Sequence, residues 1–150
     1  MLREFVENKH TVFAERFDSW EEAIKAACVP LLNDGTIEDA YVDSVIQCVK
    51  DFGPYIVIAP MIAMPHASTG AVGVHKNHIA FMKVEEPVHF DPSNSEYDAR
   101  LFFTLAAENN EKHLENMVKL SEMLMNEDLT KELMDVKCDQ DLVDLADRYL

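Results

Sequence analysis

His66 has the residue type and the setting of a nucleophile. It follows a Met-Pro pair, and the apolar run from Tyr55 to Ala59 predicts a buried strand closed by Pro60, so His66 should emerge where the strand layer meets solvent. Pro65 fixes its own φ at about −65° and favours an extended residue before it, which stiffens the segment that carries the imidazole. A neutral imidazole held in this way can attack and hold a transferred group near neutral pH. Most isolated histidines are not catalytic, so this prediction depends on the Pro-His context and on a second histidine downstream.

His113 follows a second apolar run, Arg100 to Ala106, and lies in the first turn of the helix expected next. If Asn110 is the N-cap of that helix, His113 occupies its third position, among backbone N–H groups that lack partners within the helix. A helix N-terminus attracts anions and disfavours a charged imidazole. The two histidines can therefore share a bound phosphoryl group, with His66 as the attacking base and His113 as a hydrogen-bond donor to its oxygens. An exposed helix histidine explains the pattern at His113 equally well.

Two other interpretations of this segment are weaker. Ser68 is a third candidate for contact with the phosphoryl group, although a turn position explains its residue type better. A metal site built from His66 and His113, with aspartate or glutamate as further ligands, is the rival chemistry. Ligand spacings of three or four residues are missing, so we expect no metal. No partner pattern raises the remaining histidines above surface or strand positions: His10, His75, His78 and His89.

Strands and helices must interleave to position these residues. Ser19-x-x-Glu22 has the form of a capping box that opens a helix, which Pro30 should kink or shorten before it ends at Asn33-Asp34-Gly35. Asn109 or Asn110 should cap a long helix. The other expected elements are strands at Thr11–Ala14, Ile79–Val84 and Arg100–Ala106, a helix at Asp39–Phe52 closed by Gly53, and two short helices at Leu129–Val136 and Asp141–Tyr149. This order predicts an α/β fold, and runs with little polar interruption suit strands covered on both faces.

The length and charge of the chain limit its organisation and partners. A chain of 150 residues without a Pro-, Gly- or Ser-rich divider fits a single domain over residues 1–150. Twenty-eight acidic residues against thirteen basic ones give a formal charge of −15, which repels nucleic acid and anionic lipid. Neither G-x-G-x-x-G nor G-x-x-x-x-G-K occurs, so we expect no nucleotide cofactor.

The cysteines and the apolar runs indicate where the chain works. Cys28, Cys48 and Cys138 are odd in number and widely spaced, which predicts a reduced cytoplasmic protein rather than a disulfide framework or a zinc knuckle. The N-terminus lacks the apolar core of a secretory signal. The longest apolar run is broken by Pro60 and is far shorter than the roughly 20 residues needed to span a bilayer, so we expect no membrane insertion.

Two motifs and the order of elements resemble one protein family over nearly the whole chain. The motifs are Ile-Ala-Met-Pro-His at residues 62–66 and Ala106-Ala107 followed by the Asn-rich turn to His113. With these residues the chain resembles the IIA component of the bacterial sugar phosphotransferase system, of the mannitol–fructose class. Gly-Pro-Tyr at 53–55 followed by Ala59-Pro60 is most similar to the ascorbate-type IIA proteins.

The resemblance implies a fold and a function. The implied fold is a mixed β-sheet flanked by helices on both faces. The implied function is phosphoryl relay: His66 accepts a phosphoryl group from the phosphohistidine of the carrier protein HPr and passes it to a cysteine of a IIB protein, with the membrane IIC protein reached through IIB. Neither a metal nor a nucleotide is implied, since phosphoryl transfer asks mainly for positioning and charge stabilisation.

Two positions depart from the family pattern. An arginine on the helix before the active strand assists the site in mannitol-type members, and the matching residue here is Lys50, which lacks the bidentate fork of a guanidinium. A cation that interacts with the helix dipole explains Lys50 better. The residue after the active histidine is often glycine in the family, and here it is Ala67, so the local backbone need not adopt a positive φ.

Two further functions remain open from the sequence. One is a regulatory protein that binds and controls a partner according to the phosphorylation state of His66. The other is a small hydrolase with His66 as general base, for which the chain lacks an evident nucleophile or oxyanion motif. The transported sugar and the oligomeric state are not determined by these residues.

Overall fold

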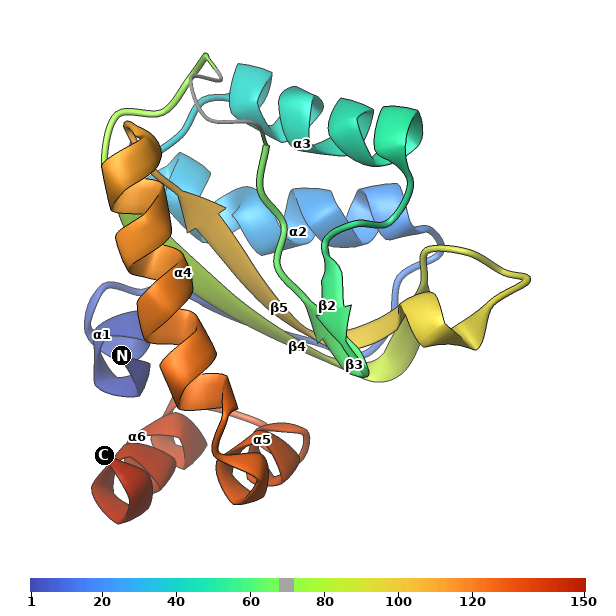
Figure 1. Cartoon of the computed structure of the whole chain (residues 1–150). Helices are drawn as coiled ribbons and strands as arrows, with labels where there is room; N and C mark the ends of the chain where they lie inside the picture. The colour runs from blue at the N-terminus through green and yellow to red at the C-terminus, as the bar shows by residue number, and fades with distance from the viewer. Residues whose placement is uncertain (68–71) are drawn as a thin grey trace.

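The computed structural model describes residues 1–67 and 72–150, and these form a mixed sheet with helices on both of its faces. In chain order the elements are α1 (Leu2–Glu7), β1 (Thr11–Ala14), α2 (Trp20–Asn33), α3 (Asp39–Phe52), β2 (Val57–Ala59), β3 (Met61–Ala63), β4 (His78–His89), a 3-10 helix (Ser95–Tyr97), β5 (Asp98–Ala106), α4 (Asn110–Leu124), α5 (Glu127–Leu133) and α6 (Asp139–Tyr149). The five strands are ordered β1-β4-β5-β3-β2, with parallel β1/β4 and β3/β5 pairs and antiparallel β4/β5 and β2/β3 pairs (Figure 1). The predicted fold class is confirmed.

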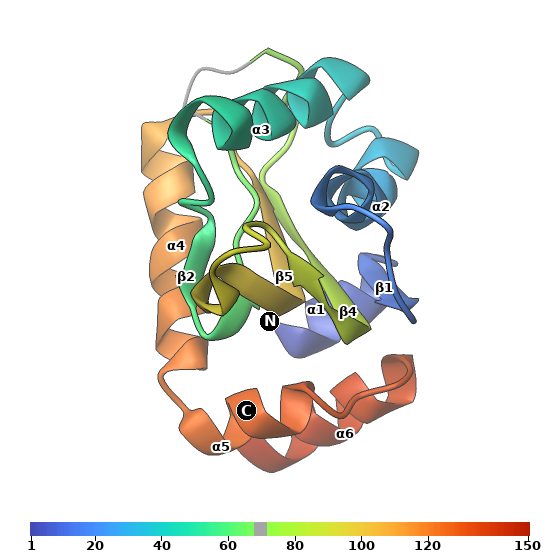
Figure 2. The same cartoon turned by 90° about the vertical axis from the view of Figure 1, so that its right-hand side faces the viewer.

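Alternating side chains along the central strands divide the core into two layers. Met82 and Phe102 pack with α2 and α3 on one face, whereas Phe81 and Phe103 pack with α1, α4, α5 and α6 on the other. This period of two is what a strand buried on both faces requires. Figure 2 shows α3 above the strands and α2 beside them, with α5 and α6 below the strands.

The two helices of the first layer follow their sequence signals closely. The Ser19 hydroxyl accepts a hydrogen bond from the Glu22 N–H at the start of α2, as the capping box predicts. Helix α2 continues past Pro30 to Asn33, where the sequence predicts its end, so Pro30 does not shorten it. Helix α3 has the predicted bounds, and Gly53 closes it with a φ of 82°, a conformation that favours glycine.

The prediction of a buried strand at Tyr55 to Ala59 is wrong in two respects. Strand β2 begins only at Val57 and is the edge strand of the sheet, with Ile58 exposed to solvent. Pro60 closes β2 as predicted and lies in a tight hairpin, after which β3 returns as an inner strand beside β5. Met61 adopts a φ of 65°, a strained value for a residue with a side chain, and this permits the abrupt reversal.

Other boundaries differ less from the expectations. Asn109, not Asn110, caps α4, since its side-chain oxygen accepts a hydrogen bond from the Lys112 N–H at 3.0 Å. Strand β4 extends beyond Val84 to His89, and helix α1 had no sequence prediction. Within residues 1–67 and 72–150, no helix is long and apolar enough to cross a membrane.

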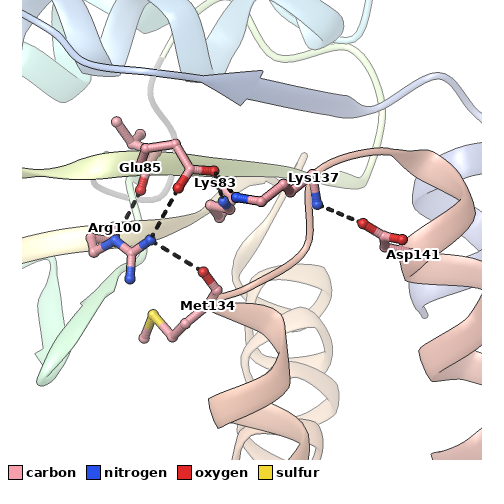
Figure 3. A network of polar contacts seen from close by, with 7 residues as sticks. Lys83, Glu85, Arg100, Met134, Lys137 and Asp141 are labelled. Atoms are coloured by element: carbon pink, nitrogen blue, oxygen red, sulfur yellow. Dashed lines mark hydrogen bonds and ion pairs between the residues drawn. The ribbon is translucent and has the colours of Figure 1, made fainter.

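A charged cluster joins the sheet to the connection between α5 and α6 (Figure 3). Lys83 on β4 is only 1% exposed, and its ammonium pairs with the Glu85 carboxylate. Lys137 and Arg100 approach the same carboxylate at 3.1 and 3.7 Å. The Arg100 guanidinium also donates to the Met134 carbonyl oxygen at 3.2 Å, which fixes the end of α5 against the strands. We call Lys83, Glu85, Arg100 and Lys137 the charged network.

Candidate active site

His66 lies just beyond β3, on a segment tied to the strands beside it. The Met64 N–H donates to the Ile56 carbonyl, and the Leu105 N–H donates to the Pro65 carbonyl at 2.9 Å. These bonds extend the pairing of β3 with its neighbours up to the histidine. The imidazole itself is half-buried, so the ring is held by the protein and still reaches solvent.

The tautomer of His66 follows from its hydrogen bond. Nδ1 lies 2.6 Å from the Met64 carbonyl oxygen. A carbonyl oxygen only accepts hydrogen bonds, so Nδ1 must carry the proton, and in the neutral ring Nε2 then holds the free lone pair. Burial lowers the pKa of His66, while the bond to Met64 raises it, and the net direction is downward. The ring is therefore neutral near pH 7, and Nε2 is its unprotonated nitrogen.

Tyr55 fixes the orientation of the His66 residue from one side. Its hydroxyl donates to the His66 backbone carbonyl at 2.5 Å, and its ring meets the imidazole edge-on with the centroids 5.2 Å apart. Tyr41, on the first turn of α3, acts on the next residue. Its hydroxyl accepts a hydrogen bond from the Ala67 N–H at 3.3 Å and donates to the Leu105 carbonyl at 2.7 Å.

His113 reaches the same place from α4. Its ring centroid lies 5.3 Å from that of His66, so the structure brings together the two histidines that the sequence singled out. With Asn109 as N-cap, His113 is the fourth helical residue, and its N–H already bonds to the Asn109 carbonyl. The expectation that its backbone N–H is unpartnered is therefore wrong. Burial, and then the neighbouring His66, lower the pKa of His113, so this ring is also neutral near pH 7.

The two rings together suit a group that carries negative charge and binds covalently. Nε2 of His66 can form a bond to an electrophile, and a neutral His113 has a ring N–H that can donate to the oxygens of that group. The first turn of α4 adds the positive end of a helix dipole beside His113. The chemistry that this pair supports best is the capture of a phosphoryl group.

The other two candidate site residues are Ser68 and Lys50. Ser68 lies outside the described residues, so its proposed contact stays a prediction. Lys50 is exposed in the last turn of α3, where a cation interacts favourably with the helix dipole, and no hydrogen bond or ion pair joins its side chain to another described residue. Among residues 1–67 and 72–150, no three histidine, cysteine, aspartate or glutamate side chains gather to hold a metal ion.

Sequence reasoning missed both tyrosines. Each contact joins positions far apart in the chain: 11 residues separate Tyr55 from His66, and 26 separate Tyr41 from Ala67. Both hydroxyls bind backbone atoms, which every residue has, so no sequence motif predicts these contacts. The only signal was Gly53-Pro54 before Tyr55, which places a turn between α3 and the edge strand and thereby returns the ring toward the histidine.

Comparisons with known proteins agree with this geometry. Residues 4–148 match the family model described as "Phosphoenolpyruvate-dependent sugar phosphotransferase system, EIIA 2". The ascorbate-specific EIIA component of Mycoplasma pneumoniae is 32% identical over 87% of this chain and 81% of its own length. The solution structure of the mannitol-specific cryptic phosphotransferase enzyme IIA of Escherichia coli superposes with a TM-score of 0.82 at 29% identity over 98% of each chain.

A third similarity is to a protein solved together with a partner. The complex of enzyme IIAMTL and phosphorylated enzyme IIBMTL from Escherichia coli gives a TM-score of 0.79 at 25% identity, covering 91% of this chain and 93% of that one. The family model, the relative and the structures all extend across the elements that hold His66 and His113. The chain therefore belongs to the type 2 EIIA family of the phosphoenolpyruvate-dependent sugar phosphotransferase system.

Proposed function

We propose that this chain is a cytoplasmic phosphoryl carrier in which Nε2 of His66 accepts a phosphoryl group from phospho-HPr and passes it to a cysteine of a IIB protein. One observation carries the assignment. The 2.6 Å bond from Nδ1 to the Met64 carbonyl leaves Nε2 as the unprotonated nitrogen of a neutral, half-buried ring. Membership of the EIIA family supports phosphoryl transfer as the reaction type.

The transfer balances without any movement of a proton. The Nε2 lone pair forms a bond to phosphorus, while the bond from phosphorus to the donor histidine nitrogen breaks and leaves its electron pair on that nitrogen. The His66 ring then carries positive charge, which is shared with the Nδ1–H group. The Met64 carbonyl dipole offsets that charge. In the second transfer a cysteine thiolate forms the bond to phosphorus, and the electron pair of the broken P–N bond returns to Nε2.

His113 has the role of stabilising the phosphoryl oxygens. Both ring pKa values lie below the ordinary histidine value, so neither ring needs to lose a proton before the group arrives. A neutral His113 donates a hydrogen bond to an oxygen that bears more negative charge as the transition state forms. Because the donor is held by α4 and the nucleophile by the β3 end, the two are oriented before the reaction begins.

The partners and the transport system follow from similarity and from the surface beside the site. Leu114 and Val118 on α4 are 63% and 48% exposed, next to His113 and one turn beyond it, and exposed apolar side chains of this kind suit contact with another protein. A IIA protein similar to this chain was solved in complex with a IIB protein. The similarity to an ascorbate-specific EIIA component supports an ascorbate uptake system, in which the membrane IIC protein would be reached through IIB.

The first test is phosphoryl uptake in the presence of Enzyme I, HPr and phosphoenolpyruvate. We expect one acid-labile phosphoryl group per chain of the wild type and none on the His66→Ala variant, because that variant lacks the nucleophile. The His75→Ala variant is a matched control, since His75 is exposed and pairs with Glu38. Label that persists in His66→Ala would move the acceptor site elsewhere.

Onward transfer separates a carrier from a regulator. The phosphorylated chain is mixed with the IIB proteins of ascorbate and mannitol systems, and label on the IIB cysteine is followed over time. We expect transfer, faster to the ascorbate-type IIB. Failure to label any IIB cysteine would favour the regulatory alternative, in which the phosphorylation state of His66 controls binding to another protein.

A further inference from the structure

Two of the four tyrosines of this chain have hydroxyls that end on the segment carrying His66. The phosphoryl transfer described above uses neither of them. Tyr55 comes from the connection between α3 and β2, and Tyr41 comes from the first turn of α3. They therefore approach the histidine segment from opposite ends of one helix, and their contacts differ in kind.

Tyr55 holds both the backbone and the ring of His66. Its hydroxyl donates to the His66 carbonyl, and its ring packs edge-on against the imidazole at 88°. With Met64 accepting from Nδ1, the ring has one hydrogen bond and one aromatic neighbour that limit its rotation, and the His113 ring lies close by as well. A ring that turned over about its Cβ–Cγ bond would move Nδ1 to the position of Cδ2, away from the Met64 carbonyl, and would move Nε2 to the position of Cε1.

Tyr41 joins the two segments that carry the two histidines. Its hydroxyl accepts from the N–H of Ala67, the residue after His66, and donates to the carbonyl of Leu105 near the end of β5. Strand β5 leads to α4 and His113. The Tyr41 side chain is buried, and burial raises its pKa to about 12, so the hydroxyl keeps its proton and its donor role at every physiological pH.

We propose that Tyr41 and Tyr55 are positioning residues of this phosphoryl transfer, which hold His66 with Nε2 directed away from the strand and at a constant separation from His113. The proposal rests on His66 being the phosphoryl acceptor. Two neutral hydroxyls, each hydrogen-bonded to backbone atoms, thereby set the geometry of the nucleophile. A carboxylate in the same place would stabilise a protonated imidazole and so remove the lone pair that the reaction needs.

Hydroxyl deletions test the proposal with two readouts. The Tyr55→Phe and Tyr41→Phe variants keep the rings and remove one hydroxyl each. Tyr149→Phe is the matched control, because the Tyr149 hydroxyl also makes a hydrogen bond, to Glu132 at the α5/α6 end of the molecule. The first readout is the 15N chemical shift of the His66 ring nitrogens without any phosphoryl donor, which reports the tautomer and its pH titration. The second is the rate of transfer to IIB.

For the wild type and Tyr149→Phe we expect one dominant His66 tautomer, protonated at Nδ1. For Tyr55→Phe and Tyr41→Phe we expect a mixed population and transfer that is slower by about tenfold, the loss typical of one hydrogen bond. Tyr55→Ala also removes the ring that packs on the imidazole. We expect transfer by this variant to fall by about a hundredfold. The pKa of its His66 should rise toward the ordinary value as the ring becomes more exposed.

The outcomes distinguish this proposal from the one on which it rests. Wild-type tautomer populations and wild-type transfer rates in both Phe variants would overturn the positioning role, even if these variants unfold at lower temperature. A wild-type chain that takes up no phosphoryl group would overturn the proposed function instead. The ring shifts are measured without phosphorylation, so they still report whether the two hydroxyls orient His66 in that case.

Discussion

Different kinds of interaction stabilise two regions of the molecule, the surroundings of His66 and the α5/α6 end. Near His66 the contacts are neutral: a backbone carbonyl on Nδ1, two tyrosine hydroxyls on backbone atoms, and a second uncharged imidazole. At the α5/α6 end the charged network places three cations around the Glu85 carboxylate (Figure 3). Within a chain of net charge −15, the charged network thus groups three cations around one carboxylate, whereas these contacts of His66 are uncharged.

The difference matches the proposed function of His66 and the structural position of the charged network. The charged network fixes the connection between α5 and α6 to the strands, and ion pairs with a buried lysine serve this purpose as long as every charge has a partner. An imidazole that must attack phosphorus needs its lone pair, and a carboxylate beside it would raise its pKa and protonate it. Neutral contacts hold the ring without changing its charge. Variants at the two ends should therefore affect different measurements.

The largest effect among these variants is expected for His113→Ala. Loss of the donor to the phosphoryl oxygens should slow transfer to IIB by about a hundredfold, the cost typical of one oxyanion donor. The unfolding temperature should change little, because His113 is only half-buried and its side chain makes no hydrogen bond to another described residue. The rate is measured by stopping the reaction at successive times and counting the radiolabel on IIB. His113→Gln keeps a donor and should recover part of it, whereas a wild-type rate for His113→Ala would reduce this residue to a bystander.

Glu85→Gln should affect stability and leave transfer unchanged. The substitution removes the charge that compensates the Lys83 ammonium, which is 1% exposed, so the unfolding temperature should fall by several degrees. Adding Lys83→Met replaces the buried cation by an apolar side chain of similar length and should restore most of the loss. Thermal unfolding followed by circular dichroism provides the comparison. Equal unfolding temperatures in the single and double variants would contradict the pairing.

The smallest effects are two losses of stability in separate pH ranges. The folded pKa of His66 lies below the ordinary value of 6.5, so its contribution is complete above pH 6.5 and is lost as the pH falls toward the folded pKa. The hydrogen bonds from Lys83 and then Lys137 lower the pKa of Glu85 from 4.5 to about 2, so its contribution is complete above pH 4.5 and is lost toward pH 2. Urea unfolding at each pH, with His66→Gln and Glu85→Gln as references, assigns the losses. Identical pH profiles for the two variants would contradict the separation.

Much of the fold was predictable because local signals agreed with the tertiary structure. The capping box at Ser19, the apolar stripe of α3 with Gly53 after it, and the uninterrupted β5 each reflect a requirement that a short segment meets by itself. The hairpin of β2 and β3 has no such local sequence signal. Each strand has three residues, Pro60 separates them, and the positive φ of Met61 has no glycine or asparagine to announce it.

The site was predictable only as far as its two histidines. His66 and His113 each follow an apolar run, and strands that are adjacent in a sheet place the residues after them close together. The distance between the rings, the protonated nitrogen of His66 and the two tyrosines depend on tertiary contacts. The same holds for Lys83, whose burial inside an apolar strand is explained only by Glu85 and the residues around it.

Identifying the nitrogen that carries phosphorus is the most direct test of the proposed transfer. The chain is prepared with 15N-labelled histidine, phosphorylated by Enzyme I and HPr, and examined for 31P–15N coupling by NMR at alkaline pH, where phosphohistidine persists. We predict a one-bond coupling from phosphorus to Nε2 of His66, with Nδ1 still facing the Met64 carbonyl. Coupling to Nδ1 of His66, or to either nitrogen of His113, would contradict it.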